Sequence, residues 1–155
     1  MASQPTRGAP TLTVGWREWV DLPDLGLSGI KAKVDTGART SALHAFAVEP
    51  YRDGGVLRAR FRIQPAHRDN RIERLCDAEV VDQRSVKNSG GDSELRLVIG
   101  TTLALGDHSW PIELTLTARD NMKFRMLLGR TAINGRALVN PERSYLTGRR
   151  TVTRD

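Results

Sequence analysis

The sequence has 155 residues, a net charge of +6 and a single cysteine. One cysteine excludes an intrachain disulfide, no stretch approaches the length of a membrane span, and the first ten residues lack the apolar run of a signal peptide. We therefore predict one cytoplasmic domain with no membrane association. The positive charge suits an acidic partner, but the arginines are scattered, so nucleic-acid binding is not expected as the main activity.

The chain order suggests many short strands between two polar tails. Residues 1–11 are rich in Ala, Ser, Pro, Gly and Thr and are expected to lack fixed structure, and residues 147–155 form a second, basic tail. The domain between them spans residues 12–146. Strands are predicted at residues 14–20, 30–34, 56–63, 78–81, 95–99, 101–105 and 112–117.

The strand at residues 56–63 has the clearest pattern, because apolar residues alternate with three arginines. Period-two alternation is typical of a half-buried strand. Residues 65–71 indicate a loop, 88–92 the tip of a long hairpin, and 105–109 a turn. The only helix predicted is a short one at residues 130–134. Short strands with glycine-rich turns favour an all-β barrel or sandwich.

One motif carries chemistry. An apolar strand ends directly in Asp35-Thr36-Gly37. Strand ends present side chains at the mouth of a sheet, Gly37 allows a tight turn and close approach of a substrate, and the Thr36 hydroxyl can brace the loop. Taken alone, these three residues are more often an ordinary turn.

A second segment changes that interpretation. Leu127-Leu128-Gly129-Arg130 follows a buried strand and enters the predicted helix. Together the two motifs resemble the retropepsin family of aspartic proteases, over about residues 14–140. Residues 34–43, 110–112 and 126–129 resemble a bacterial branch often labelled "ATP-dependent zinc protease". Some members of that branch are associated with ATP-grasp glutamate ligases that modify a ribosomal protein.

The resemblance implies a retropepsin-like acid-protease barrel and a mechanism. Two carboxylates in contact share one proton, so the charged one activates water and the neutral one protonates the oxyanion. Asp35 matches the catalytic position, Thr36 the residue that hydrogen-bonds across a dimer, and Gly37 the tight turn. Because the chain carries one such motif, a second copy must supply the other aspartate, which implies a homodimer.

The resemblance also assigns supporting and substrate-binding positions. Leu127 and Leu128 would pack beneath the catalytic loop, Gly129 would give clearance, and Arg130 would be a structural ion-pair partner. The hairpin at residues 79–99 would be a flap over the peptide. Substrate contacts are expected from the loop and from the flap tip, at Ala38, Arg39, Ser89, Gly90 and Gly91. Arg39 either holds the loop or meets an acidic substrate, such as a glutamate-rich tail.

Metal and cofactor sites are not predicted. His44, His67, His108 and Cys76 fall at no zinc-ligand spacing, and no phosphate-binding glycine loop followed by lysine is present. Three alternatives to the peptidase stay open. They are a non-catalytic peptide-binding or adaptor module that partners a glutamate ligase, a basic nucleic-acid-binding barrel, and a zinc hydrolase.

Overall fold

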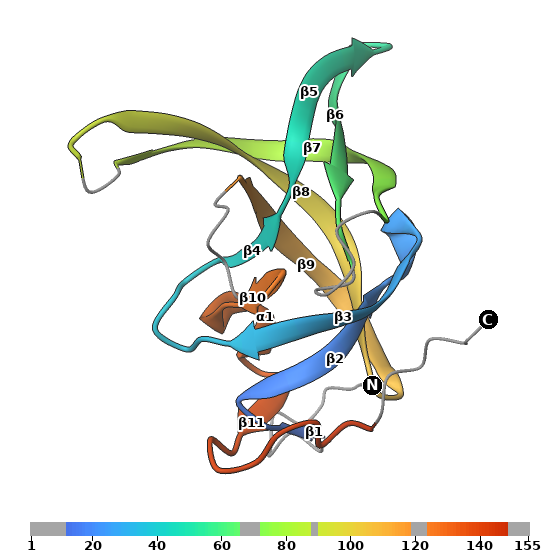
Figure 1. Ribbon diagram of the computed structural model, residues 1–155, viewed down its shortest axis with the longest axis vertical. Helices are drawn as coiled ribbons and strands as arrows, with labels where there is room; N and C mark the ends of the chain where they lie inside the picture. The colour runs from blue at the N-terminus through green and yellow to red at the C-terminus, as the bar shows by residue number, and fades with distance from the viewer. Residues whose placement is uncertain (1–11, 66–71, 88–89, 119–123, 149–155) are drawn as a thin grey trace, which may run out of the picture.

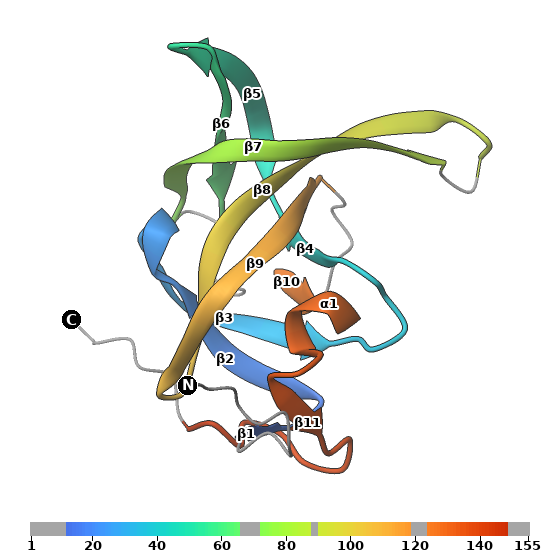
Figure 2. The same ribbon diagram turned by 180° about the vertical axis from the view of Figure 1, so that it is seen from behind.

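The computed structural model describes residues 12–65, 72–87, 90–118 and 124–148 (Figures 1 and 2). This part of the chain is mostly β-strand with one short α-helix, which confirms the all-β prediction. The elements in chain order are β1 Leu12–Val14, β2 Arg17–Leu22, η1 Pro23–Leu25, β3 Leu27–Val34, β4 Ser41–His44, β5 Phe46–Asp53, β6 Val56–Ile63, β7 Arg74–Lys87, β8 Ser93–Leu105, β9 His108–Thr117, β10 Met126–Leu128, α1 Arg130–Ile133 and β11 Ala137–Val139.

Six of the strands close into a barrel. The large sheet has the order β2-β3-β10-β4-β9-β8-β7-β6-β5. A further pairing of β2 with β8 closes six of these strands, β2, β3, β10, β4, β9 and β8, into a ring. The hairpins β5–β6 and β7–β8 both extend beyond this barrel (Figure 1). The predicted retropepsin-like barrel is therefore confirmed. Within the described residues, no helix is long and apolar enough to cross a bilayer.

The core follows the predicted alternation. In β6, Ala59, Phe61 and Ile63 are buried, while Arg60 and Arg62 are exposed. The predicted helix is confirmed at Arg130–Ile133. Leu, Ile and Val side chains supply most of the interior because the chain has few aromatic residues.

The single strand predicted at residues 14–20 is wrong. The strand is interrupted between β1 and β2, and Gly15 explains the interruption. A Cβ at Gly15 would lie 2.1 Å from the carbonyl oxygen of Arg143, and the Gly15 amide donates to Glu18. The backbone turns here to meet the returning C-terminal segment, so β1 pairs with β11 rather than continuing into β2.

The boundary predicted between residues 99 and 101 is also wrong, because β8 runs through Gly100. Gly100 pairs with Glu113 in β9. The β8–β9 ladder continues before and after Gly100 without a register shift. The glycine therefore interrupts the apolar pattern but not the hydrogen bonding. Strands β4 and β5 had no counterpart in the prediction.

A buried carboxylate joins the two ends of the described chain. Glu18 has no exposed surface, and its side chain accepts hydrogen bonds from the amides of Gly15, Leu146 and Thr147 and from the Thr147 hydroxyl. Tyr145 stacks on Trp19 with ring centroids 5.2 Å apart. Thr147, the first residue of the predicted basic tail, is thus bound to β2.

Candidate active site

Strand β3 positions Asp35 directly at its end. Strand β10 runs parallel to β3 with Val34 opposite Leu128, and the Asp35 amide donates to the Leu128 carbonyl at 2.8 Å. The two motifs found in the sequence are therefore adjacent in space. The Asp35 side chain is half-buried, so it stays accessible at the mouth of the barrel.

The Asp-Thr-Gly loop turns around the aspartate. The Gly37 amide donates to Oδ1 of Asp35 at 3.0 Å, and the Ala38 amide donates to the Asp35 carbonyl at 3.1 Å. A Cβ at Gly37 would lie 3.3 Å from Oδ1, which is tighter than most Cβ contacts. Thr36 and Gly37 are exposed. The glycine therefore leaves one carboxylate oxygen oriented by a backbone amide, with open surface beside it.

Gly129 lies against the other side of this loop. A Cβ there would be 2.6 Å from the carbonyl carbon of Thr40 and 3.0 Å from the carbonyl oxygen of Ala38. The Gly129 amide donates to Oγ of buried Ser41 at 2.9 Å. Sequence reasoning predicted the clearance at Gly129 but missed Ser41, whose only signal was its place in the residues that resemble the bacterial branch.

Arg130 contacts main-chain carbonyl groups of the Asp-Thr-Gly loop. Its guanidinium donates to the Thr36 carbonyl at 3.2 Å, and its amide donates to the Ala38 carbonyl at 2.8 Å. The prediction was an ion-pair partner, and the contact recorded in the described residues is instead with a peptide oxygen. Beneath the loop, Leu128 is fully buried and Leu127 is half-buried.

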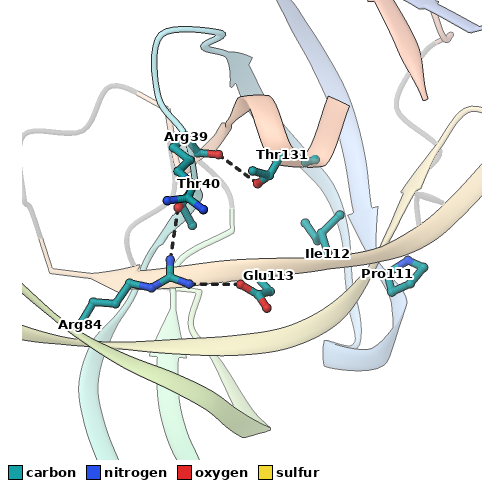
Figure 3. Close-up of a pocket in the computed structure, with 8 residues that line it drawn as sticks. Arg39, Thr40, Arg84, Pro111, Ile112, Glu113 and Thr131 are labelled. Atoms are coloured by element: carbon teal, nitrogen blue, oxygen red, sulfur yellow. Dashed lines mark hydrogen bonds and ion pairs between the residues drawn. The ribbon is translucent and has the colours of Figure 1, made fainter. Parts of the chain in front are cut away.

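A pocket opens beside the loop, with a volume of about 470 Å³ (Figure 3). It lies where the Asp-Thr-Gly loop, β7, β9 and α1 meet. Arg39 was predicted as a substrate contact and does line this pocket, but Arg84 was not singled out from the sequence. The lining residues are Arg39, Thr40, Arg84, Pro111, Ile112, Glu113, Thr131 and Ala132.

The predicted flap corresponds to the β7–β8 hairpin, paired from Val80 opposite Ile99 to its outer end. Gly90 and Gly91 lie at the turn, and Gly91 has φ +90°, which favours glycine. Both views show this hairpin extending outward from the barrel (Figures 1 and 2). Ser89 lies outside the described residues.

The candidate metal ligands in the described part of the chain do not form a cluster. Buried His44 lies in β4, exposed His108 begins β9, and buried Cys76 lies in β7, while His67 falls outside the described ranges. No group of three or more His, Cys, Asp or Glu side chains in the described part of the chain is arranged to hold a metal ion. Burial raises the pKa of the Cys76 thiol to about 11, so this group is protonated at neutral pH.

The closed barrel, with Asp-Thr-Gly at a strand end and glycine packed behind it, defines the retropepsin-like class. A family model described as "Retropepsin-like aspartic endopeptidase RimB" matches residues 13–150, and the chain belongs to this RimB-like family.

Relatives that are similar in sequence are named as ligases and not as endopeptidases. The chain is 44% identical over 135 residues to a "Probable alpha-L-glutamate ligase" of Shewanella pealeana, and 48% identical over 137 residues to one of Parasynechococcus marenigrum. These matches cover 87% and 88% of this chain but only 30% and 29% of the relatives, so the chain spans about a third of their length. The crystal structure of a Legionella pneumophila protein of unknown function is similar, with a TM-score of 0.76 and 28% identity over 89% of this chain and 99% of that one.

Proposed function

We propose that the chain is a cytoplasmic aspartic endopeptidase that works as a homodimer, with Asp35 of each subunit forming the catalytic pair. The observation that carries the proposal is the held Asp35 loop. Asp35 sits at the end of a barrel strand, its Oδ1 accepts the Gly37 amide, and Gly129 packs directly behind the loop. The match to a family described as an aspartic endopeptidase supports the same function.

The chemistry uses one proton shared between two carboxylates. Neighbouring carboxylates cannot both ionise readily, so one stays neutral. The ionised one takes a proton from a water molecule, and the resulting hydroxide attacks the peptide carbonyl carbon. The neutral one donates its proton to the carbonyl oxygen as that oxygen gains charge. The carboxylic acid formed by deprotonating water then gives that proton to the amine nitrogen as the C–N bond breaks, and the proton on the former carbonyl oxygen returns to the other carboxylate, which restores the singly protonated pair.

The count of motifs supports the proposed dimer. The sequence has one Asp-Thr-Gly, and a two-fold axis brings the same residue of each subunit together. Exposed Thr36, next to the catalytic residue, is then free to contact the partner loop. The β7–β8 hairpin would act as the flap, with substrate contacts at Ala38, Arg39, Ser89, Gly90 and Gly91.

The proposed substrate is a peptide rich in acidic residues. Relatives named glutamate ligases suggest a functional link to an enzyme that adds glutamate, and the chain's net charge of +6 favours an acidic chain. An α-linked glutamate tail contains ordinary peptide bonds, which an aspartate pair can hydrolyse. Electrostatic selection of this kind should weaken as salt is raised.

The test is cleavage of glutamate-extended protein by wild type and by Asp35→Asn. Asparagine keeps the shape of the side chain but cannot accept a proton from water, so cleavage should fall by several orders of magnitude while the melting temperature changes little. A variant that cleaves at a rate near wild type would contradict the catalytic role of Asp35.

A second candidate is a non-catalytic peptide-binding module that partners a ligase. The observation favouring it is that the relatives, about three times longer, are named as ligases rather than peptidases. It predicts binding of glutamate peptides by the wild-type chain with no cleavage at any pH.

A further inference from the structure

Arg84 connects the root of the flap hairpin to the catalytic loop. Its guanidinium donates to the Thr40 hydroxyl at 3.2 Å and to Glu113 on β9 at 3.3 Å (Figure 3). Its Nε also donates to Asp82 at 2.9 Å. Its side chain keeps 38% of its surface exposed, so the charge stays reachable from the pocket. Arg84 is therefore a cation held in position at the pocket wall, with its free surface facing solvent.

A bulge determines which way Arg84 points. The β7–β8 ladder shifts register between Val80 and Asp82, which leaves Val81 as an extra residue. A one-residue shift moves every later side chain to the other face, so Arg84 lies on the face opposite to Val80. Without this bulge, the cation would not reach the catalytic loop.

The same face carries a second arginine. Arg84 lies directly opposite Arg96 in the antiparallel ladder, and like charges in that arrangement destabilise a sheet. Asp82 and Glu94, each two residues earlier on its strand, offset part of the repulsion through ion pairs with Arg84 and Arg96. Nε of Arg96 is buried and has no hydrogen-bond partner in the described structure. This face thus carries two arginines together with two acidic residues, and the Nε donor of Arg96 is left unpaired among the described residues.

Arg39 adds a cation from the other side. It lies four residues after Asp35, its carbonyl accepts from the Thr131 hydroxyl and amide, and its side chain is exposed. Within the described residues, the Arg39 guanidinium forms no ion pair. Figure 3 shows Arg39 and Arg84 reaching the pocket from two different segments. Among the described residues that line it, Glu113 is the only acidic one.

We propose that this pocket is a subsite for a carboxylate side chain of the substrate, with Arg39 and Arg84 as specificity-determining residues. Glu113 is then an internal competitor, because it occupies Arg84 until a substrate carboxylate replaces it. The inference rests on the proposed peptidase function, which it deepens by assigning the acidic preference to particular residues. Guanidinium groups suit this role because they bind carboxylates with two parallel hydrogen bonds.

The first experiment compares the cleavage of two peptides that differ only by glutamate or glutamine at one position. The comparison is repeated with that position placed at each residue that flanks the cleaved bond. Wild type should prefer glutamate at one position by about tenfold in kcat/KM, since a hydrogen bond to a charged group at a half-exposed site has about that effect. Arg84→Gln and Arg39→Gln should each bring the ratio toward one. Glu113→Gln should raise kcat/KM for the glutamate peptide about threefold, because the competitor is gone.

Matched controls separate a local effect from net charge. Arg62 on β6 and Glu73, the residue before β7, form an exposed ion pair 3.7 Å apart. Arg62→Gln and Glu73→Gln make the same charge changes as the pocket variants and should leave the glutamate preference as in wild type. If they change it as much as the pocket variants do, the preference comes from the long-range field and the subsite is wrong.

A binding experiment makes the subsite testable without cleavage. Titration of the Asp35→Asn chain with tetraglutamate and tetraglutamine, followed by calorimetry, should show tighter binding of tetraglutamate, and Arg84→Gln should remove the difference. If wild type cleaves nothing but this difference is present, the peptidase proposal fails and the subsite stands. If glutamate and glutamine behave alike in both experiments, or if Arg84→Gln weakens both peptides equally, the subsite is refuted.

Discussion

Replacing Gly129 by alanine should damage both stability and cleavage, because the methyl group has no room. The backbone at Gly129 has φ −86° and ψ 174°, an extended conformation that alanine adopts easily. The obstacle is therefore contact and not backbone strain. The new Cβ would lie 2.6 Å from the Thr40 carbonyl carbon and 2.8 Å from its oxygen, and both are main-chain atoms of the catalytic loop.

The size of the effect follows from these contacts. An ordinary Cβ contact begins at 3.4 Å, so the loop or strand β10 must move by about 0.8 Å. Overpacking of this kind costs about 1–3 kcal/mol of stability. A displacement near 1 Å in catalytic groups lowers rates by about a hundredfold. The loop also depends on hydrogen bonds from the Gly129 and Arg130 amides, which the shift would stretch.

The assay is denaturant unfolding together with kcat/KM on a glutamate-extended substrate. Gly100→Ala is the matched control, because its Cβ would meet only a methyl group of the exposed Val81 side chain, at the ordinary contact distance of 3.4 Å. We expect Gly129→Ala to lose about a hundredfold in kcat/KM while Gly100→Ala stays within about twofold. A Gly129→Ala protein with wild-type stability and wild-type cleavage would refute the close packing of the two motifs.

Other predictions test the rest of the molecule. Glu18→Gln should lower the free energy of unfolding by about 2 kcal/mol, since one carboxylate accepts four hydrogen bonds, and the melting temperature should fall by about 6 °C; an unchanged melting curve would mean that residues 146–147 do not depend on it. Cys76, buried and with a pKa of about 11, should resist iodoacetamide at pH 8 in the native state, react faster as the pH rises toward 11, and label fully on unfolding; rapid native labelling at pH 8 would contradict its burial. Chelators should leave cleavage intact because a carboxylate pair activates water without a metal, whereas a large loss restored by zinc would favour a metallohydrolase.

Local signals explain which features could be predicted from the sequence. Strand β6 is recognisable because its apolar and arginine residues alternate strictly, and α1 because it follows Gly129. The Asp35 loop and residues 127–130 are each contiguous motifs, and β3–β10 pairing brings them together. Strand β4 has only four residues of mixed polarity, and β5 contains Pro50, so neither shows a clear period.

The missed features depend on long-range contacts. Arg84 reaches Thr40 across 44 residues, and the bulge at Val81, which alternation cannot reveal, decides its face. Glu18 sits in a strand where a glutamate ordinarily faces water, and only the return of Leu146 and Thr147 makes its burial favourable. The contacts of Arg84 and Glu18 could therefore be recognised only from the tertiary structure.

The pairing of Asp35 between two subunits is tested most directly by mixing subunits. Wild-type chain is equilibrated with a ninefold excess of Asp35→Asn chain, and cleavage per wild-type subunit is measured. If the active unit is a dimer with one aspartate from each chain, most wild-type subunits enter mixed dimers, and activity should fall about tenfold. The same excess of Arg62→Gln chain, which keeps Asp35, should cause no loss when cleavage is counted per subunit that carries Asp35. Activity per wild-type subunit that stays constant at every ratio would show that each chain acts alone and would contradict the shared catalytic pair.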